Sequence, residues 1–274
     1  MEILGVLNVT RDSFSDGGQY VDPQHAIAHA RQLVADGAAI IDVGAQSTRP
    51  DAEEVSAEEE ISRLAPVVAA LRSDGTRVSI DTYRPAVMRA ALGWGVEVIN
   101  DVTALRDDEA VAALRASDCR VILMHSTSSQ ARAERLDVGP EGIVPRIREF
   151  FRERIATLAT AGICRQRLIL DPGMGLFLSC DPRTSLAVLR NLSTLAGFGL
   201  PLCVSTTRKS FLGQVLARGS EARPVGERAA GTLASELWAA TQGVQYLRTH
   251  DVAALHDAWT VWQAIQGLPA RGVQ

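Results

Sequence analysis

Polar side chains follow the short apolar runs of this 274-residue chain, and their types suit the binding of a charged heterocycle. Asp81, Asn100 and Asp171 can accept hydrogen bonds from the edge of an amino-pyrimidinone ring, and the amide of Asn100 can also donate one. Cations follow other runs, namely Arg49, Arg208, Lys209, Arg248 and His250. Because arginine matches phosphate geometry, the set as a whole predicts a polar heterocycle tied to a phosphate as the ligand.

The apolar runs themselves are predicted to be strands, because they are short, rich in β-branched residues and followed by helical patterns. The predicted strands are Ile3–Leu7, Ile40–Val43, Val78–Asp81, Val96–Asn100, Val121–Met124, Leu168–Leu170, Leu202–Ser205 and Gln245–Arg248. Helical patterns between or after them include Pro23–Asp36, Gly142–Ala161 and Val252–Ile265. Strands that alternate with helices imply a parallel sheet.

The fold class that this alternation favours is a single α/β TIM barrel, (β/α)₈, which typically needs about 250 residues. An open Rossmann-like sheet is the alternative, and the absence of G-x-G-x-x-G after the first strand disfavours it. We expect one catalytic barrel domain over residues 1–267 and a loose tail over 268–274. In such a barrel the C-terminal strand ends meet at one mouth, which would bring the polar residues together.

Composition excludes several other classes of protein. The formal net charge of -4 and the pI near 5.8 argue against a nucleic-acid binder. The N-terminus has no signal-peptide pattern, and no apolar run approaches the ~20 residues of a membrane span. The four cysteines form no C-x-x-C pair, which is typical of reduced thiols in a cytoplasmic protein.

Single positions in this pattern would carry little weight. An Asp or Asn after a strand is usually a turn former or a helix cap, and a lone Arg or Lys is usually a solvated charge. His25 and His29 are likewise expected on the solvated face of the first helix rather than at a metal. The prediction therefore depends on polar residues recurring at all the predicted strand ends.

The same residues resemble dihydropteroate synthase in an ordered set of motifs that spans nearly the whole chain. The set comprises Gly5–Thr10 with Asp12–Gly18, Ser47–Pro50, Ser79–Thr82, Ile99–Val102, Met124-His125, Asp171–Gly175, Arg208–Phe211 and Arg248–Val252. The resemblance implies an enzyme, a transferase that condenses dihydropterin pyrophosphate with p-aminobenzoate to give 7,8-dihydropteroate and pyrophosphate in folate biosynthesis. It also implies small-molecule substrates, Mg²⁺ as cofactor, a homodimer and a cytoplasmic location.

Roles for matching positions come with the resemblance. Asp81, Asn100, Met124, Asp171, Lys209 and Arg248 would bind the pterin, with Asp81, Lys209 and Arg248 as catalytic residues. Asn8, Arg248 and His250 would bind pyrophosphate, with Asn8 facing the metal. Thr48, Arg49, Pro50 and Ser210 would contact p-aminobenzoate, and the loops Thr10–Tyr20 and Gly44–Asp51 would close over both substrates.

Departures from the family's usual motifs resemble the mobile sulfonamide-insensitive (Sul-type) branch. Arg11 replaces a proline, Gly44-Ala45-Gln46 replaces Gly-Gly-Glu, Ser126-Thr127-Ser128 follows His125, and Gly175–Ser185 looks about two residues longer than usual. Sulfonamides mimic p-aminobenzoate but carry extra bulk. Leu176 or Phe177 could clash with that bulk, so we expect insensitivity to sulfonamides.

Two other functions remain open from the sequence. A corrinoid-linked, pterin-dependent methyltransferase shares the Asp, Asn and Asp set that binds the ring, but has less need for the later cationic motifs. A non-catalytic pterin-binding homologue would keep the fold, and the altered Gly44–Gln46 segment leaves this alternative open.

Overall fold

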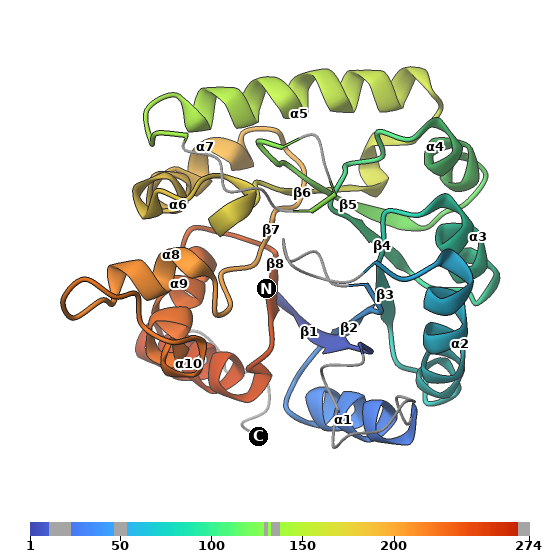
Figure 1. The fold of residues 1–274 in the computed structure, drawn as a ribbon, viewed down its shortest axis with the longest axis horizontal. Coiled ribbons are helices and arrows are strands. Elements are labelled where there is room, and N and C mark those ends of the chain that lie inside the picture. Colours follow the sequence, from blue (N-terminus) through green and yellow to red (C-terminus); the bar gives the residue numbers. More distant parts are fainter. Residues whose placement is uncertain (11–22, 47–53, 129–130, 133–137, 268–274) are drawn as a thin grey trace.

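Eight parallel strands curl into one barrel in the computed structural model, which describes residues 1–10, 23–46, 54–128, 131–132 and 138–267 (Figure 1). The strands are β1 (Glu2–Asn8), β2 (Ile40–Gly44), β3 (Val78–Asp81), β4 (Val98–Asp101), β5 (Arg120–Met124), β6 (Leu168–Asp171), β7 (Cys203–Val204) and β8 (Tyr246–Thr249). The tail, residues 268–274, lies outside the described residues, as do the Arg11 departure and most of the two predicted substrate-covering loops.

The strand order closes the sheet on itself. Neighbours run β6-β5-β4-β3-β2-β1-β8-β7, and every pair is parallel. The two ends of that order meet where Leu170 pairs with Leu202 and where the Leu170 amide donates to the Pro201 carbonyl at 2.8 Å. The predicted (β/α)₈ barrel is therefore confirmed.

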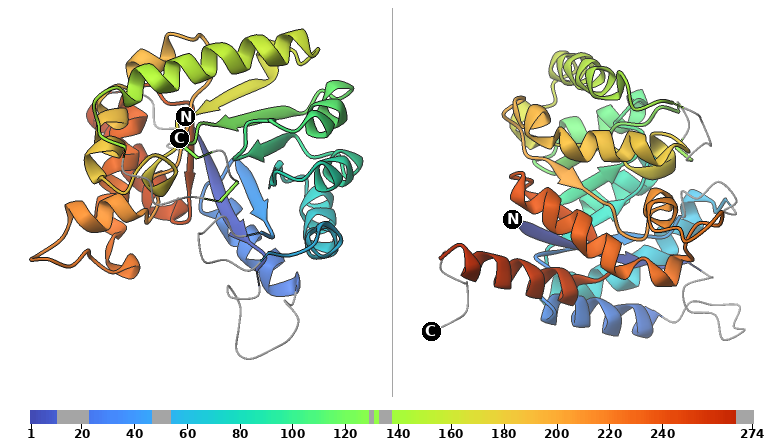
Figure 2. Two further views of the ribbon diagram at one scale, coloured as in Figure 1. Left: turned by 45° about the horizontal axis from the view of Figure 1, so that its top comes forward. Right: turned by 90° about the vertical axis from the view of Figure 1, so that its left-hand side faces the viewer.

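Helices surround the barrel (Figures 1 and 2). They are α1 (Pro23–Ala35), α2 (Ala57–Ser73), α3 (Pro85–Gly93), α4 (Asp108–Arg115), α5 (Ile143–Thr160), α6 (Pro182–Arg190), α7 (Leu192–Ala196), α8 (Ser210–Val215), α9 (Ala229–Thr241) and α10 (Val252–Ile265). Short 3₁₀ turns lie at η2 (Arg165–Arg167), η3 (Gly175–Phe177) and η4 (Val225–Glu227). In the described residues, β6 and β7 are each followed by two α-helices, which the sequence pattern did not resolve.

Local sequence signals explain where several helices begin. Ser56 caps α2 by accepting a hydrogen bond from the Glu59 amide at 3.1 Å, and acidic residues fill the first turn of that helix. Asp107 caps α4 in the same way. Proline at the first position of α3 and of α6 presets the helical φ angle and needs no hydrogen-bond donor there.

The barrel interior contains a layer of side chains from seven different strands. These residues are Leu4, Ile40, Val98, Ile122, Ile169, Cys203 and Tyr246, all buried. Contacts among so many strands are possible only inside the barrel. A separate, larger apolar cluster fills the space between the strands and the helices. This interior layer excludes water from the floor of any binding site that lies above it.

Alternation along each strand then places polar residues directly above that layer. Side chains two residues apart on a strand face the same side. Asp42 follows Ile40, Asn100 follows Val98, Met124 follows Ile122, Asp171 follows Ile169, and Arg248 follows Tyr246, each by two positions. These residues therefore face the interior at the C-terminal ends of the strands, which we call the mouth.

Candidate active site

A buried arginine shared by two carboxylates forms the centre of the mouth. Arg248 Nε donates to Asp42 Oδ2 at 2.6 Å, and Arg248 Nη2 donates to Asp81 Oδ2 at 2.7 Å. Asn100 Nδ2 donates to the same Asp42 oxygen at 3.1 Å. Four strands, β2, β3, β4 and β8, are thereby joined through side chains at one point.

The electrostatics of this centre follow from burial. Burial raises the pKa of Asp81, the Arg248 charge opposes that rise, and the nearby Asp42 charge adds to it. Burial alone would lower the pKa of Arg248, but the two carboxylates outweigh this and raise it. Arg248 therefore stays charged, and its charge limits the rise in the pKa of Asp81 that burial causes.

Asp42 is the site residue that sequence reasoning missed. It lies within the predicted strand Ile40–Val43, and the motifs of the sequence assign it no role. The usable signal was its position two residues after the apolar Ile40, which turns it inward. Its side chain is fully buried and accepts from both Arg248 and Asn100.

A second pair of opposite charges lies beside this centre. Burial raises the pKa of Asp171 to about 6. Two groups oppose this rise, namely the Gly173 amide, which donates to the Asp171 carboxylate at 2.8 Å, and the positive charge of Lys209. Burial lowers the pKa of Lys209 to about 8, opposed by Asp171. The two groups titrate on either side of neutral pH, as active-site groups often do.

An apolar wall borders these charges. Val102, Met124 and Phe177 form a buried cluster, against which Tyr83, Ala131 and Leu176 pack. The Lys209 ammonium lies 5.3 Å from the centroid of the Phe177 ring, within the range of a cation–π contact. The mouth thus offers one apolar face and one hydrogen-bonding edge, which suits a flat polar heterocycle.

A further polar group lies at the ends of β1 and β8. Asn8 Nδ2 lies 3.4 Å from His250 Nε2, and His250 Nδ1 lies 3.1 Å from Thr207 Oγ1. Asn8 is exposed at the end of β1. Imidazole and amide groups at an exposed rim can receive the anionic part of a ligand whose ring is held deeper in the mouth.

Comparison with known proteins places the chain in a family. A family model for pterin binding enzymes matches residues 4–250. Dihydropteroate synthase type-3 of Escherichia coli is 44% identical over 265 residues, covering 96% of this chain and 99% of that protein. The chain belongs to the dihydropteroate synthases. The resemblance found in the sequence is thereby confirmed, and with it the assignment as a transferase.

Other relatives agree with this assignment. Dihydropteroate synthase type-2 of Escherichia coli is 44% identical over 265 residues, with 96% of each chain covered. The structure of Xanthomonas albilineans dihydropteroate synthase with 4-aminobenzoic acid matches with a TM-score of 0.87 and 39% identity. It covers 98% of this chain and 94% of that one.

Most residues predicted for the site of this synthase lie at the mouth. Arg248 donates a hydrogen bond to Asp81, and Asn100 is joined to Arg248 through Asp42. Asp171 and Lys209 interact with one another and with Arg248 through their charges. Met124 pairs in register with Asp171. A Cβ on Gly175 would lie 3.5 Å from Ser210 Oγ, so that Ser210 borders the η3 turn. Thr48, Arg49 and Pro50 lie outside the described residues.

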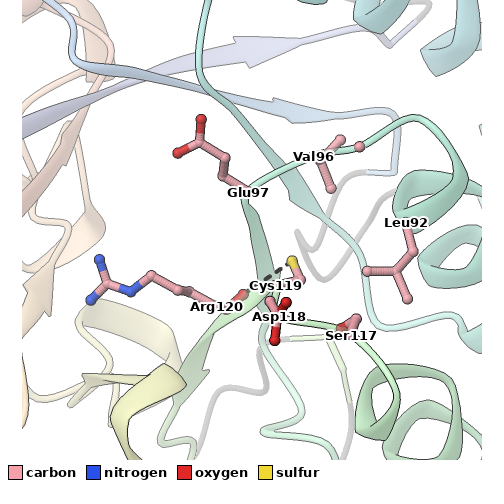
Figure 3. A pocket seen from close by; sticks show the side chains of 8 residues that line it. Leu92, Val96, Glu97, Ser117, Asp118, Cys119 and Arg120 are labelled. Atoms are coloured by element: carbon pink, nitrogen blue, oxygen red, sulfur yellow. Dashed lines mark hydrogen bonds between the residues drawn. The ribbon is translucent and has the colours of Figure 1, made fainter.

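A pocket of about 420 Å³ at the other end of the barrel is separate from this site (Figure 3). It is lined by Leu92, Gly95, Val96, Glu97, Ser117, Asp118, Cys119 and Arg120. Glu97 precedes β4 and Arg120 begins β5, so the pocket lies at the N-terminal ends of the strands. In barrels of this type that end serves stability rather than chemistry.

Polar residues of α9 hold the strand ends that carry the cations. Thr232 Oγ1 accepts from the Arg208 amide at 3.0 Å, and Ser235 Oγ donates to Thr206 Oγ1 at 2.8 Å. Glu236, which is 1% exposed, lies beside Thr249 at the end of β8. Burial raises the pKa of Glu236 from 4.5 to about 8, and the Asp251 charge adds to the rise.

The protonated state of Glu236 makes stability depend on pH. Because folding raises the pKa of Glu236, this residue contributes fully to the free energy of unfolding below pH 4.5, and the contribution is lost as pH rises through about 8. We expect Glu236→Gln, which stays neutral, to gain stability relative to the wild type between those values, by up to about 1.4 kcal/mol per pH unit. Urea unfolding at pH 5 and pH 8 measures the difference. The exposed Glu153→Gln variant is the control and should show no such trend; an equal effect of Glu236→Gln at both values would contradict the prediction.

Proposed function

We propose that this chain joins dihydropterin pyrophosphate to p-aminobenzoate and releases 7,8-dihydropteroate and pyrophosphate. The observation that carries the proposal is the mouth itself, where Arg248 is shared by Asp42 and Asp81 next to the Asp171 and Lys209 pair. We further propose that residues 1–267 act as one catalytic unit. The four cysteines, all free in the structure, favour the reducing cytoplasm as its location.

The pterin ring is proposed to lie between the apolar wall and the charged groups. Asp171 as a carboxylate can accept from the ring's adjacent N–H donors, and Asn100 can both donate and accept. Lys209 as an ammonium can donate to a ring acceptor. Asp81 completes the hydrogen-bonding edge, while Met124 belongs to the apolar face. The guanidinium plane of Arg248 would stack against the ring.

The pyrophosphate is proposed to lie at the rim, near Asn8, His250 and Arg248. The Asn8 amide presents its nitrogen to His250, and its other atom, Oδ1, is the hard oxygen donor that Mg²⁺ prefers. No cluster of three or more His, Cys, Asp or Glu side chains suited to a metal occurs among the residues that the structure describes. Asn8 therefore fits an ion that takes most of its ligands from the substrate's phosphates, and such an ion would neutralise the leaving group.

The reaction then needs positioning and electrostatics rather than a protein nucleophile. The carbon–oxygen bond to pyrophosphate breaks, and the leaving group takes the bonding electrons. The carboxylates near the ring stabilise positive charge on the pterin methylene carbon. The aniline nitrogen of p-aminobenzoate forms the new carbon–nitrogen bond and loses a proton. Ser210 and the predicted contacts Thr48, Arg49 and Pro50 are proposed to hold p-aminobenzoate in line for that attack.

Pyrophosphate release from the two substrates with Mg²⁺ tests this function. We expect kcat/KM to fall below about pH 6, where Asp171 takes up a proton, and above about pH 8, where Lys209 loses one. Asp171→Asn should lower kcat/KM by about a hundredfold. Asp118→Asn, the same substitution at the opposite end of the barrel, should leave it unchanged.

Three outcomes would contradict the proposed reaction. Binding of the pterin without turnover would point to a non-catalytic homologue. Methyl transfer to a corrinoid protein would point to the methyltransferase. Full activity of Asp171→Asn would show that the reaction does not use this mouth.

We also propose that the synthase discriminates against sulfonamides through Leu176 and Phe177. Phe177 is 9% exposed, and its carbonyl accepts from the Thr127 amide at 2.9 Å and from the Thr127 hydroxyl at 3.1 Å. Two departures from the usual family pattern, the Ser126–Ser128 and Gly175–Ser185 segments, are thus bonded to each other. This fixes Phe177 beside Lys209, where its ring could exclude bulk beyond p-aminobenzoate.

Inhibition by sulfamethoxazole, measured against the KM for p-aminobenzoate, tests this discrimination. We expect Phe177→Ala to lower the inhibitory concentration about tenfold, equivalent to about 1.4 kcal/mol, with little change in that KM. Val215→Ala, an exposed position on α8, is the control. Wild-type enzyme that is inhibited as strongly as a housekeeping synthase would refute the proposal.

We propose that two copies of the chain associate through α9 and α10. These helices lie side by side on one side of the barrel (Figure 2). Val261 and Ile265, one turn apart on α10, are 59% and 74% exposed, and Trp238 on α9 is 47% exposed. Trp259 and Trp262 stack with centroids 4.8 Å apart on the same helix. An apolar face of this kind marks an interaction site.

Sedimentation of the purified chain tests the dimer. We expect the wild type to sediment as a dimer and the Val261→Asp, Ile265→Asp double variant as a monomer, because burying two carboxylates at an interface is unfavourable. Val34→Asp on α1, a 39% exposed position, should remain dimeric. A monomeric wild type, or a double variant that still dimerises, would contradict the assignment of this interface.

A further inference from the structure

The connection between β4 and α4 contains two consecutive residues in the left-handed backbone region. Ala104 has a φ of 57° and Leu105 a φ of 56°, and both are fully buried. Neither is glycine, so each costs roughly 1–2 kcal/mol relative to an ordinary conformation. Such a pair persists only where surrounding contacts hold it, so the contacts around this turn must supply that energy.

The carboxylate of Asp101, the last residue of β4, holds the amide side of the turn. Its Oδ1 accepts from the Thr103 amide and from the Thr103 hydroxyl, each at 2.7 Å. Its Oδ2 accepts from the Leu105 amide at 2.7 Å. Asp101 is fully buried and follows Asn100 directly, so alternation turns it away from the mouth.

Arg154, from α5, holds the carbonyl side of the same turn. Its Nε donates to the Ala104 carbonyl at 2.7 Å, and its Nη2 donates to the Leu105 carbonyl. One guanidinium thus bridges the two left-handed residues, which a lysine, with a single ammonium nitrogen, cannot do with the same geometry. The positive charge also opposes the rise that burial causes in the pKa of Asp101.

The turn connects these outer residues to both faces of the binding site. Val102, its first residue, packs with Met124 and Phe177 in the apolar wall. Asn100, just before Asp101, donates to Asp42 at the centre of the mouth. A change in the course of the backbone between them would move the wall relative to the hydrogen-bonding edge.

We infer that Arg154 and Asp101 are positioning residues that fix the spacing between Val102 and Asn100, and so set the affinity for the pterin ring. They act from outside the mouth through the left-handed pair, and neither is assigned a contact with substrate. This inference rests on the proposed function, because it takes the pterin to lie between the wall and the carboxylates.

Kinetics with Arg154→Ala and Arg154→Lys test the inference. We expect Arg154→Ala to raise the KM for dihydropterin pyrophosphate about tenfold or more while the KM for p-aminobenzoate stays within about twofold, because only one wall moves. Arg154→Lys should also raise the KM for dihydropterin pyrophosphate, since a positive charge alone does not bridge two carbonyls. Arg148→Ala, an exposed arginine on the same helix, is the matched control and should match the wild type.

A second substitution distinguishes positioning from general loss of structure. Adding Ala104→Gly to Arg154→Ala removes the backbone penalty that Arg154 offsets, so it should restore much of the pterin KM. If Arg154→Ala does not fold, Thr103→Ala, which removes one hydrogen bond to Asp101, supplies a milder version of the same change. Equal rises in both KM values, or no rescue by glycine, would overturn the inference.

Direct binding separates this inference from the proposed reaction. Calorimetric titration with 6-hydroxymethylpterin measures ring affinity without turnover. Weaker binding by Arg154→Ala, by about tenfold, supports the positioning role even if the wild type proves inactive as a synthase. If the wild type binds the pterin and Arg154→Ala binds it with the same affinity, the positioning role is refuted but the proposed reaction is not. Absence of binding by the wild type overturns the pterin site and the inference together.

Discussion

The binding site depends on one buried cation that two carboxylates share. Arg248 connects Asp42 and Asp81 across the barrel, and Asn100 joins through Asp42. Burying these charges separately would be costly, and removing one partner of a buried pair typically costs about 3–5 kcal/mol. Their arrangement is therefore tolerated only as a set. That requirement aligns the ends of four strands and prepares a rigid, charged edge before any ligand arrives.

The apolar layer beneath the mouth gives these charges their strength. Leu4, Ile40 and Ile122 help to fill the barrel below them, so little water screens the groups above. The same burial moves the pKa values of Asp171 and Lys209 toward neutrality, to about 6 and about 8. A site that works by positioning and electrostatics needs both conditions. The fold meets them through simple alternation, with an apolar residue and a polar residue two positions apart on one strand.

Helices outside the barrel supply a second level of order. Thr232 and Ser235 on α9 bond to the segment after β7, and Glu236 of the same helix lies beside the end of β8. Arg154 on α5 reaches the turn after β4. Both helices bring polar groups into the layer between strands and helices, where an apolar side chain would normally pack. Each such group costs stability unless it is paired. Their presence is understandable if the strand ends must be held more accurately than apolar packing can hold them.

The sequence by itself determined the barrel and most residues of the mouth, because alternation and strand ends are local properties that spacing reveals. Asp81, Asn100, Asp171, Lys209 and Arg248 could all be predicted in this way. The family followed from the resemblance of its motifs in their order along the chain. Only the tertiary structure decided that Asp42 shares Arg248, that Thr127 fixes Phe177, and that Arg154 supports two left-handed residues about fifty positions earlier. The assigned roles of all these residues, and of Thr48, Arg49 and Pro50, remain predictions. Contacts of this kind depend on strand register and on the paths of loops, which a pattern of residue types does not encode.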